Sequence, residues 1–166
     1  YILVFPNYEV SHSFLNYLLA DHIGKDLSLI DPIIGKLKKA LYADNSPVFI
    51  EIIQSMFAGI PYNLHIPKEA YYHSLFYMIL KLIGCNIQLE SLSANGRVDG
   101  ILEFTDIIYI IEFKYGKAKA AMQQIKDRSY SAPYLSCGKR ITLLAIGFGK
   151  KKVEYLCEEI TIDGHG

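Results

Sequence analysis

The sequence predicts an α/β fold in which helices flank a mixed β-sheet, preceded by an all-helical segment. Helix-start signals recur through the first third of the chain, and no strand is expected before residue 85. From residue 67 the expected order is helix, three strands, helix and strand. The two most apolar strands, Ile107–Tyr115 and Arg140–Phe148, flank the second of these helices. A strand, a crossover helix and another strand favour parallel pairing, and strands that are apolar on both faces are expected at the centre of a sheet.

Three helices are expected in the N-terminal third, each beginning beside a residue suited to capping. Asn7 precedes an amphipathic stretch and is expected to cap it. Asp31 and Ser46 each stand directly before a proline, which favours them as N-caps with the proline in the first helical position. The helices that they open are expected to run to about Tyr42 and Ala58. We therefore expect residues 1–66 to form a helical extension of a domain that spans residues 67–166.

The elements of that domain follow from changes in apolar periodicity and from turn signals. The stretch from Pro67 to Ile83 is apolar nearly all round, which is typical of a buried helix. The last segment, Val153–Ile160, is consistent with either a strand or a helix. The elements between them are expected at Asn86–Ser91, Arg97–Phe104 and Ile107–Tyr115 (strands), Lys117–Tyr130 (helix) and Arg140–Phe148 (strand).

The composition bounds the class of protein. The 166 residues are 51% hydrophobic and 20% charged, as in a globular chain. No run of about 18 apolar residues is present, so no membrane-spanning helix and no membrane partner are expected. Three widely spaced cysteines form neither a disulfide framework nor a zinc pattern, which favours a reducing compartment, the cytoplasm. The chain begins with Tyr1, so we expect a fragment or a processed product, and an upstream targeting segment stays open.

Charge is unevenly distributed along a chain that is neutral overall. Residues 1–113 carry 7 basic and 12 acidic residues, whereas residues 114–152 carry 10 basic residues and one acidic residue. The helix expected within the basic stretch can contact nucleic-acid phosphates, or its charges can form a solvated face balanced by neighbouring acids. The candidate contacts are Lys117, Lys119, Lys126 and Arg128.

The chemically informative element is the strand Ile107–Tyr115. Strand alternation places Glu112 and Lys114 on the same otherwise apolar face, where each needs a partner or a metal ion. A plain Glu112–Lys114 ion pair at the strand end is one explanation. However, Asp99 lies on the preceding strand and approaches Glu112 if the two strands form a hairpin. Converging carboxylates repel each other unless a cation lies between them, and oxygen ligands suit Mg²⁺ or Mn²⁺.

Asp99 and Glu112-Phe113-Lys114 on an apolar strand, followed by a basic helix, resemble the motif of the PD-(D/E)xK nuclease superfamily. The element order resembles its restriction-endonuclease-like fold, although Val98 stands where the superfamily name has proline. Further segments are similar to the C-terminal nuclease domain of bacterial AAA-ATPase-like proteins. These segments are Phe5–Val10, Tyr72–Phe76, Gly96–Asp99, Tyr109–Lys114, Gln124–Lys126 and Tyr130.

The resemblance implies a divalent-metal-dependent nuclease that hydrolyses phosphodiester bonds of nucleic acid, with DNA favoured. It implies that Glu69 joins Asp99 and Glu112 as a metal ligand, and that Gln124 reaches the site beside the catalytic Lys114. It also implies an upstream ATPase-like domain as a partner and is compatible with a homodimer. The alternative is a catalytically silent nuclease-fold module that binds nucleic acid or protein and serves a linked ATPase.

Overall fold

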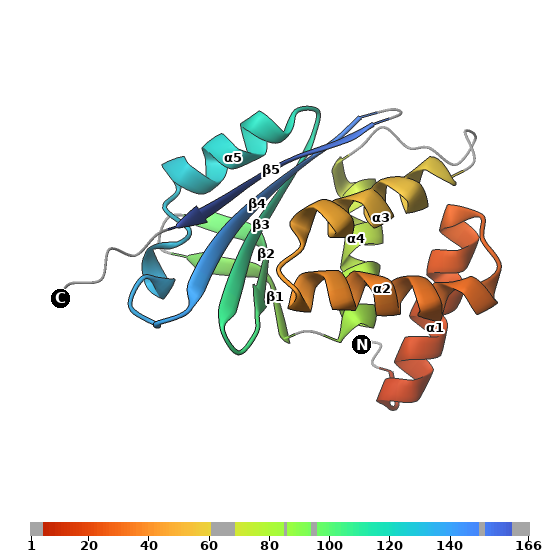
Figure 1. Cartoon of the computed structure of the whole chain (residues 1–166). Helices are drawn as coiled ribbons and strands as arrows, with labels where there is room; N and C mark the ends of the chain where they lie inside the picture. Colours follow the sequence, from red (N-terminus) through yellow and green to blue (C-terminus); the bar gives the residue numbers. More distant parts are fainter. Residues whose placement is uncertain (1–4, 61–68, 85, 94–95, 150–151, 161–166) are drawn as a thin grey trace. The chain divides into compact units, whose positions relative to one another are not determined.

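The chain forms two compact units in the computed structural model, one helical and one built on a sheet (Figure 1). The helical unit comprises residues 1–66 and 73–84, and the sheet unit comprises residues 67–72 and 85–166. Within the described part of the chain, no helix is both long and apolar enough to cross a bilayer. The residues that the structure describes are 5–60, 69–84, 86–93, 96–149 and 152–160.

The helical unit has a core made of the apolar faces of its helices. Phe49 and Phe76 are fully buried and meet edge to face, with their ring centroids 6.1 Å apart. Helix α4 (Glu69–Ile83) begins in the sheet unit and belongs to the helical unit from His73 onward. The helices are α1 (Tyr8–Ile23), α2 (Ile30–Tyr42), α3 (Ser46–Ala58) and α4 (Glu69–Ile83), with a 3₁₀ turn at Leu27–Leu29.

The helix starts follow the predicted positions, but two of the three predicted caps are wrong. Asn7 caps α1 as expected, since its side chain accepts a hydrogen bond from the Val10 N–H at 2.9 Å. Helix α3 already includes Ser46, and its cap is Asn45. Helix α2 follows directly from the 3₁₀ turn, so Asp31 lies inside its first turn and does not cap it. Asp31 instead accepts a hydrogen bond from the Asn16 amide at 2.8 Å.

The sheet unit confirms the predicted mixed sheet. Its five strands lie in sequence order, β1-β2-β3-β4-β5, and every neighbouring pair is antiparallel except β3 and β4. That parallel pair is joined through helix α5, as the crossover pattern predicted (Figure 1). The segment that sequence periodicity left open, Val153–Ile160, is a strand. The strands are β1 (Asn86–Ser93), β2 (Gly96–Glu103), β3 (Ile107–Tyr115), β4 (Arg140–Phe148) and β5 (Val153–Ile160).

Helix α5 (Ala118–Asp127) lies across one face of β3, β4 and β5 and buries its apolar side there (Figure 1). The helix is shorter than predicted, because the chain turns at Ser129, where φ is 48°. Tyr130 therefore lies beyond the helix end and is buried. The apolar core under α5 is formed by Val98, Ile101, Ile108, Ile110, Ala121, Met122, Ile125, Tyr130, Ile141, Leu143 and Ala145.

An aromatic cluster packs on the opposite face of β3 and β4, at the ends of the two strands. Tyr72, from the first turn of α4, stacks almost flat on Phe148, with ring centroids 4.8 Å apart and an interplanar angle of 11°. Its ring also stacks on Tyr115 at 5.9 Å. Stacked rings of this kind add about 0.5–1.5 kcal/mol beyond their buried area. The cluster fixes the carboxyl end of β3, which is where Glu112 and Lys114 lie.

Gly147 allows the start of α5 to pass directly over β4. A Cβ atom at this position would lie 2.4 Å from the backbone nitrogen of Ala118 and 2.5 Å from the carbonyl oxygen of Gly116. Both neighbours are backbone atoms that cannot move without displacing the helix. Gly147 is also the register partner of Lys114 in the parallel pair. Close backbone approach at this glycine therefore sets the position of α5 over the strand that carries the charged residues.

We predict that Gly147→Ala lowers the free energy of unfolding by about 1–3 kcal/mol, the usual cost of overpacking a tight contact. Chemical denaturation followed by circular dichroism measures it. Gly35→Ala on α2 is the matched control, because a Cβ at that position meets nothing within 4 Å. Alanine in a helix is favoured over glycine, so the control is expected to be neutral or stabilising. Equal stability of wild type and Gly147→Ala would contradict this account of the helix–strand contact.

Candidate active site

Glu112 is a charged residue placed inside an apolar sheet. It lies on β3 next to Ile110, on the face covered by α5, and its side chain is 1% exposed. Among the residues whose burial the structure describes, it is the only buried Asp, Glu, Lys or Arg. An isolated carboxylate at such a position is strongly disfavoured, so its surroundings must supply hydrogen bonds or positive charge.

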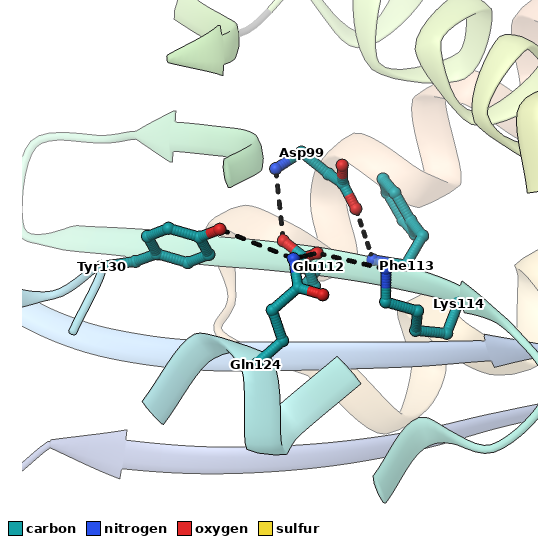
Figure 2. A network of polar contacts seen from close by, with 6 residues as sticks. All are labelled: Asp99, Glu112, Phe113, Lys114, Gln124 and Tyr130. Atoms are coloured by element: carbon teal, nitrogen blue, oxygen red, sulfur yellow. Dashed lines mark hydrogen bonds and ion pairs between the residues drawn. The ribbon is translucent and has the colours of Figure 1, made fainter. Parts of the chain in front are cut away.

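Asp99 on β2 and Glu112 on β3 lie next to each other, one residue beyond the end of the β2–β3 ladder. The paired residues of this hairpin run from Glu103–Ile108 to Gly100–Ile111. Just beyond the last pair, the Phe113 N–H donates a hydrogen bond to Oδ2 of Asp99 at 2.9 Å. The Asp99 N–H in turn points to Oε2 of Glu112 at 3.4 Å (Figure 2). The structure thus brings the two carboxylates together at the sheet position that the hairpin register predicted. Sequence reasoning did not foresee that backbone N–H groups hold them there.

Gln124 approaches the same carboxylate from α5. Its side-chain amide donates a hydrogen bond to Oε1 of Glu112, and the same Nε2 lies 3.5 Å from the hydroxyl oxygen of Tyr130 (Figure 2). The glutamine therefore reaches the site, as the resemblance implied. Tyr130, another residue of the resemblance, is both buried and next to this amide. The turn at Ser129 directs it back toward the helix, and no local sequence signal revealed that turn.

Lys114 occupies the next position on the same face, closer to solvent. Its Nζ lies 3.8 Å from Oε1 of Glu112, and its side chain is 29% exposed (Figure 2). The contact is long for an ion pair, and the ammonium group retains access to solvent. Lys114 can therefore offset the charge of Glu112 and still contact a molecule bound at the carboxylates.

The electrostatics of the site favour a cation beside the carboxylates. The pKa of Glu112 is raised to about 8, first by burial and then by the negative charge of Asp99, whereas the charge of Lys114 opposes the shift. Near neutral pH the buried carboxyl therefore retains a proton for much of the time. A divalent cation between two carboxylates would favour the ionised form of both, so this donor set fits Mg²⁺ or Mn²⁺.

The described part of the chain provides two carboxylates for such an ion. Within it, no three His, Cys, Asp or Glu side chains converge as a metal-binding group. Glu69 opens α4, but its side chain lies outside the described residues, so its predicted role as a third ligand stays a prediction. Water and substrate oxygens commonly complete a magnesium coordination sphere that begins with one or two carboxylates.

The basic residues predicted on the second helix have different environments. Lys117 lies at the N-terminal boundary of α5, and it and Lys119 are exposed. Arg128 is also exposed, at the other end of the helix. Lys126 forms an ion pair with Glu158 on β5, with Nζ and Oε2 2.6 Å apart. Its charge is thus matched by a neighbouring acid, as the alternative interpretation of a basic helix anticipated for such residues.

Comparison with known proteins decides the family. Residues 67–158, more than half of the chain, match the sequence profile of the PD-(D/E)XK nuclease superfamily. The chain belongs to this superfamily. The matched region of this PD-(D/E)XK protein begins just before α4 and ends within β5, so it includes every element that carries the site. No solved structure matches the chain.

This PD-(D/E)XK chain also resembles a longer curated protein. It is 31% identical over 158 residues to an uncharacterized protein encoded in the vnfD 5′ region of Azotobacter chroococcum mcd 1. The similar region covers 90% of this chain but only 30% of that protein. The chain therefore spans less than a third of the relative's length.

Proposed function

We propose that this PD-(D/E)XK chain is a divalent-metal-dependent nuclease that hydrolyses phosphodiester bonds of nucleic acid, with DNA as the favoured substrate. The observation that carries the proposal is the pair of carboxylates at the end of the β2–β3 ladder. Asp99 and Glu112 lie on adjacent strands, share backbone N–H contacts and have a lysine beside them. Two acids and a lysine in this arrangement suit hydrolysis of a negatively charged ester.

The proposed roles follow from the contacts of each side chain. Asp99 and Glu112 would hold Mg²⁺ or Mn²⁺, which when bound supplies a Lewis acid and a more acidic water molecule. Gln124 fixes the orientation of the Glu112 carboxylate through its amide hydrogen bond. Lys114 is placed to stabilise charge on the phosphate or to orient the attacking water, because its ammonium group lies at the exposed edge of the site.

The flanking helix would contribute phosphate contacts outside the metal site. Lys117 and Lys119 are exposed at its beginning, and Arg128 is exposed at its end. Each exposed lysine or arginine that neutralises a phosphate strengthens binding and makes the affinity fall more steeply as the salt concentration rises. Lys126 is expected to contribute less, because Glu158 matches its charge.

Calorimetric titration with Mn²⁺ tests the proposed metal site without knowledge of the substrate. We expect saturable binding to wild type that is lost in Asp99→Ala, since a divalent ion needs both carboxylates. The matched control is Asp106→Ala, which removes an aspartate at the opposite end of the same hairpin. Binding that is equal in wild type and Asp99→Ala would contradict the site. If wild type is silent with and without DNA, the catalytically silent module becomes the better account.

The wider setting of the domain belongs to the same proposal. The Azotobacter relative is more than three times as long as the region that it shares with this chain. That length is compatible with the predicted ATPase-like domain upstream in a longer parent protein. The homodimer and the cytoplasmic location stay predictions from the sequence.

A further inference from the structure

An open surface cavity of about 520 Å³ lies along one side of α5. Two of its lining residues, Gln124 and Tyr130, are also members of the polar network at Glu112 (Figure 2). A phosphodiester bound at Asp99 and Glu112 would therefore have one of its neighbouring nucleotides beside this cavity. The lining residues are Ala120, Gln123, Gln124, Asp127, Arg128 and Tyr130.

The lining is polar and carries both donors and acceptors. The Gln123 amide donates to Oδ1 of Asp127 at 2.7 Å, which fixes the carboxylate at the cavity wall. A carboxylate oxygen has two acceptor positions and the group has two oxygens, so Asp127 can accept further hydrogen bonds. Arg128 provides N–H donors and positive charge. Such a lining disfavours a purely apolar ligand, and the acid disfavours a bare phosphate group.

A nucleobase complements this set of groups, and guanine does so best. An ionised carboxylate can only accept hydrogen bonds, and guanine presents two adjacent donors, N1–H and the N2 amino group. Its O6 and N7 atoms are acceptors that suit an arginine. In duplex DNA the N1–H and the N2 amino group already pair with cytosine. A base bound through them must therefore be unpaired, in a single strand or extruded from a duplex.

We propose that this cavity binds an unpaired guanine base of the nucleotide beside the reacting phosphodiester, with Asp127 accepting from its Watson–Crick edge. The inference rests on the proposed nuclease function for the place of the phosphodiester. To that function the inference adds two preferences, one for single-stranded substrate and one for guanine beside the cut site. Both would be determined by residues at α5. Gln123 holds the carboxylate and acts as a positioning residue.

The test is a binding measurement that does not depend on catalysis. Fluorescence anisotropy in EDTA compares two labelled polythymidine strands, one with a central guanine and one with hypoxanthine, which lacks the N2 amino group. Wild type is expected to bind the guanine strand about tenfold more tightly, the usual value of one base-edge contact. Asp127→Asn is expected to reduce this ratio to about one, because the amide replaces one carboxylate oxygen with an N–H donor that cannot accept from the guanine N2 amino group. Equal affinities of wild type for the two strands, or a ratio preserved in Asp127→Asn, would overturn the proposal.

Arg140→Gln is the matched control for loss of positive charge in the sheet unit. Arg140 begins β4 and pairs with Ile107, at the opposite end of β3 from Glu112. Arg140→Gln and Arg128→Gln are both expected to retain the ratio of guanine to hypoxanthine affinity, because the two bases share the O6 and N7 acceptors assigned to Arg128. Arg128→Gln is expected to weaken the binding of both strands more than Arg140→Gln does. Mapping of cut sites on a random single strand in Mn²⁺ separates the two proposals. If guanine is preferred in EDTA but no strand is cut in Mn²⁺, the base site stands and the nuclease proposal fails. If strands are cut without a flanking base preference, the nuclease proposal stands and the base site fails.

Discussion

Lys114→Met is expected to slow nucleic-acid cleavage by about 10²–10³-fold, the usual loss when one charge-stabilising group is removed from a reaction site. Methionine retains much of the side-chain length but has no ammonium group. The loss follows from the position of Nζ, 3.8 Å from Glu112 and accessible from solvent. Single-turnover cleavage of labelled DNA in Mn²⁺ measures the rate. A Lys114→Met protein that cleaves as fast as wild type would remove this lysine from the mechanism.

Two further variants serve as a control and as a test of which role Lys114 has. Lys139→Met removes a lysine from the opposite end of the sheet, where its ammonium group contacts Glu103 at 2.7 Å, and it is expected to leave cleavage unchanged. Lys114→Arg retains the positive charge but binds its proton more strongly than lysine. Recovery of activity with arginine would assign Lys114 to charge stabilisation. Continued loss with arginine would assign it to orienting or deprotonating the water.

Glu112→Gln is expected to stabilise the metal-free protein at high pH and to abolish metal binding. The folded-state pKa of Glu112 is raised from 4.5 to about 8, first by burial and then by the charge of Asp99. Between these two values the unfolded chain releases a proton that the folded chain keeps. Stability therefore falls as pH rises from about 4.5 to about 8, and the loss is complete above that range. A tenfold difference in proton affinity between the folded and unfolded chains corresponds to about 1.4 kcal/mol, so the full loss of stability is a few kcal/mol.

Urea denaturation in EDTA at several pH values tests this expectation. Wild type and Glu112→Gln should have similar stability near pH 4, and the variant should be increasingly more stable toward pH 9. The amide keeps an oxygen for the hydrogen bond from Gln124, so the change removes charge with little change in shape. Glu103→Gln, a partly exposed glutamate on β2, should alter stability by less than about 1 kcal/mol. A difference between wild type and Glu112→Gln that does not grow with pH would contradict the raised pKa.

The sequence predicted the sheet and the meeting of Asp99 with Glu112 because strong local signals determine both. The turn at Thr105-Asp106 sets the hairpin register, and strand alternation then sets the faces. The apolar strand Arg140–Phe148 was predicted with its correct boundaries, because burial on both faces leaves an uninterrupted apolar run. These features depend on residues that are close in sequence or on a simple period.

The remaining details depend on contacts that local patterns do not contain. The N-cap positions of α2 and α3 lie two residues and one residue before the predicted ones, since a preceding turn can shift a helix start at little cost. The pairing of Lys126 with Glu158 joins residues that are distant in sequence. The cavity beside Gln124 arises because the turn at Ser129 brings Tyr130 back beside α5. Such features follow from tertiary packing and could not be predicted from a single sequence.

Metal-dependent cleavage is the most direct test of the proposed function. Purified wild type and Asp99→Ala are incubated with single-stranded, duplex and branched DNA in Mn²⁺, then in EDTA, and again after Mn²⁺ is restored. We predict cleavage by wild type that stops in EDTA, returns with Mn²⁺ and is at least about 10²-fold slower in Asp99→Ala. Cleavage that persists in EDTA, or that is equally fast in Asp99→Ala, would contradict a metal-dependent reaction at the two carboxylates.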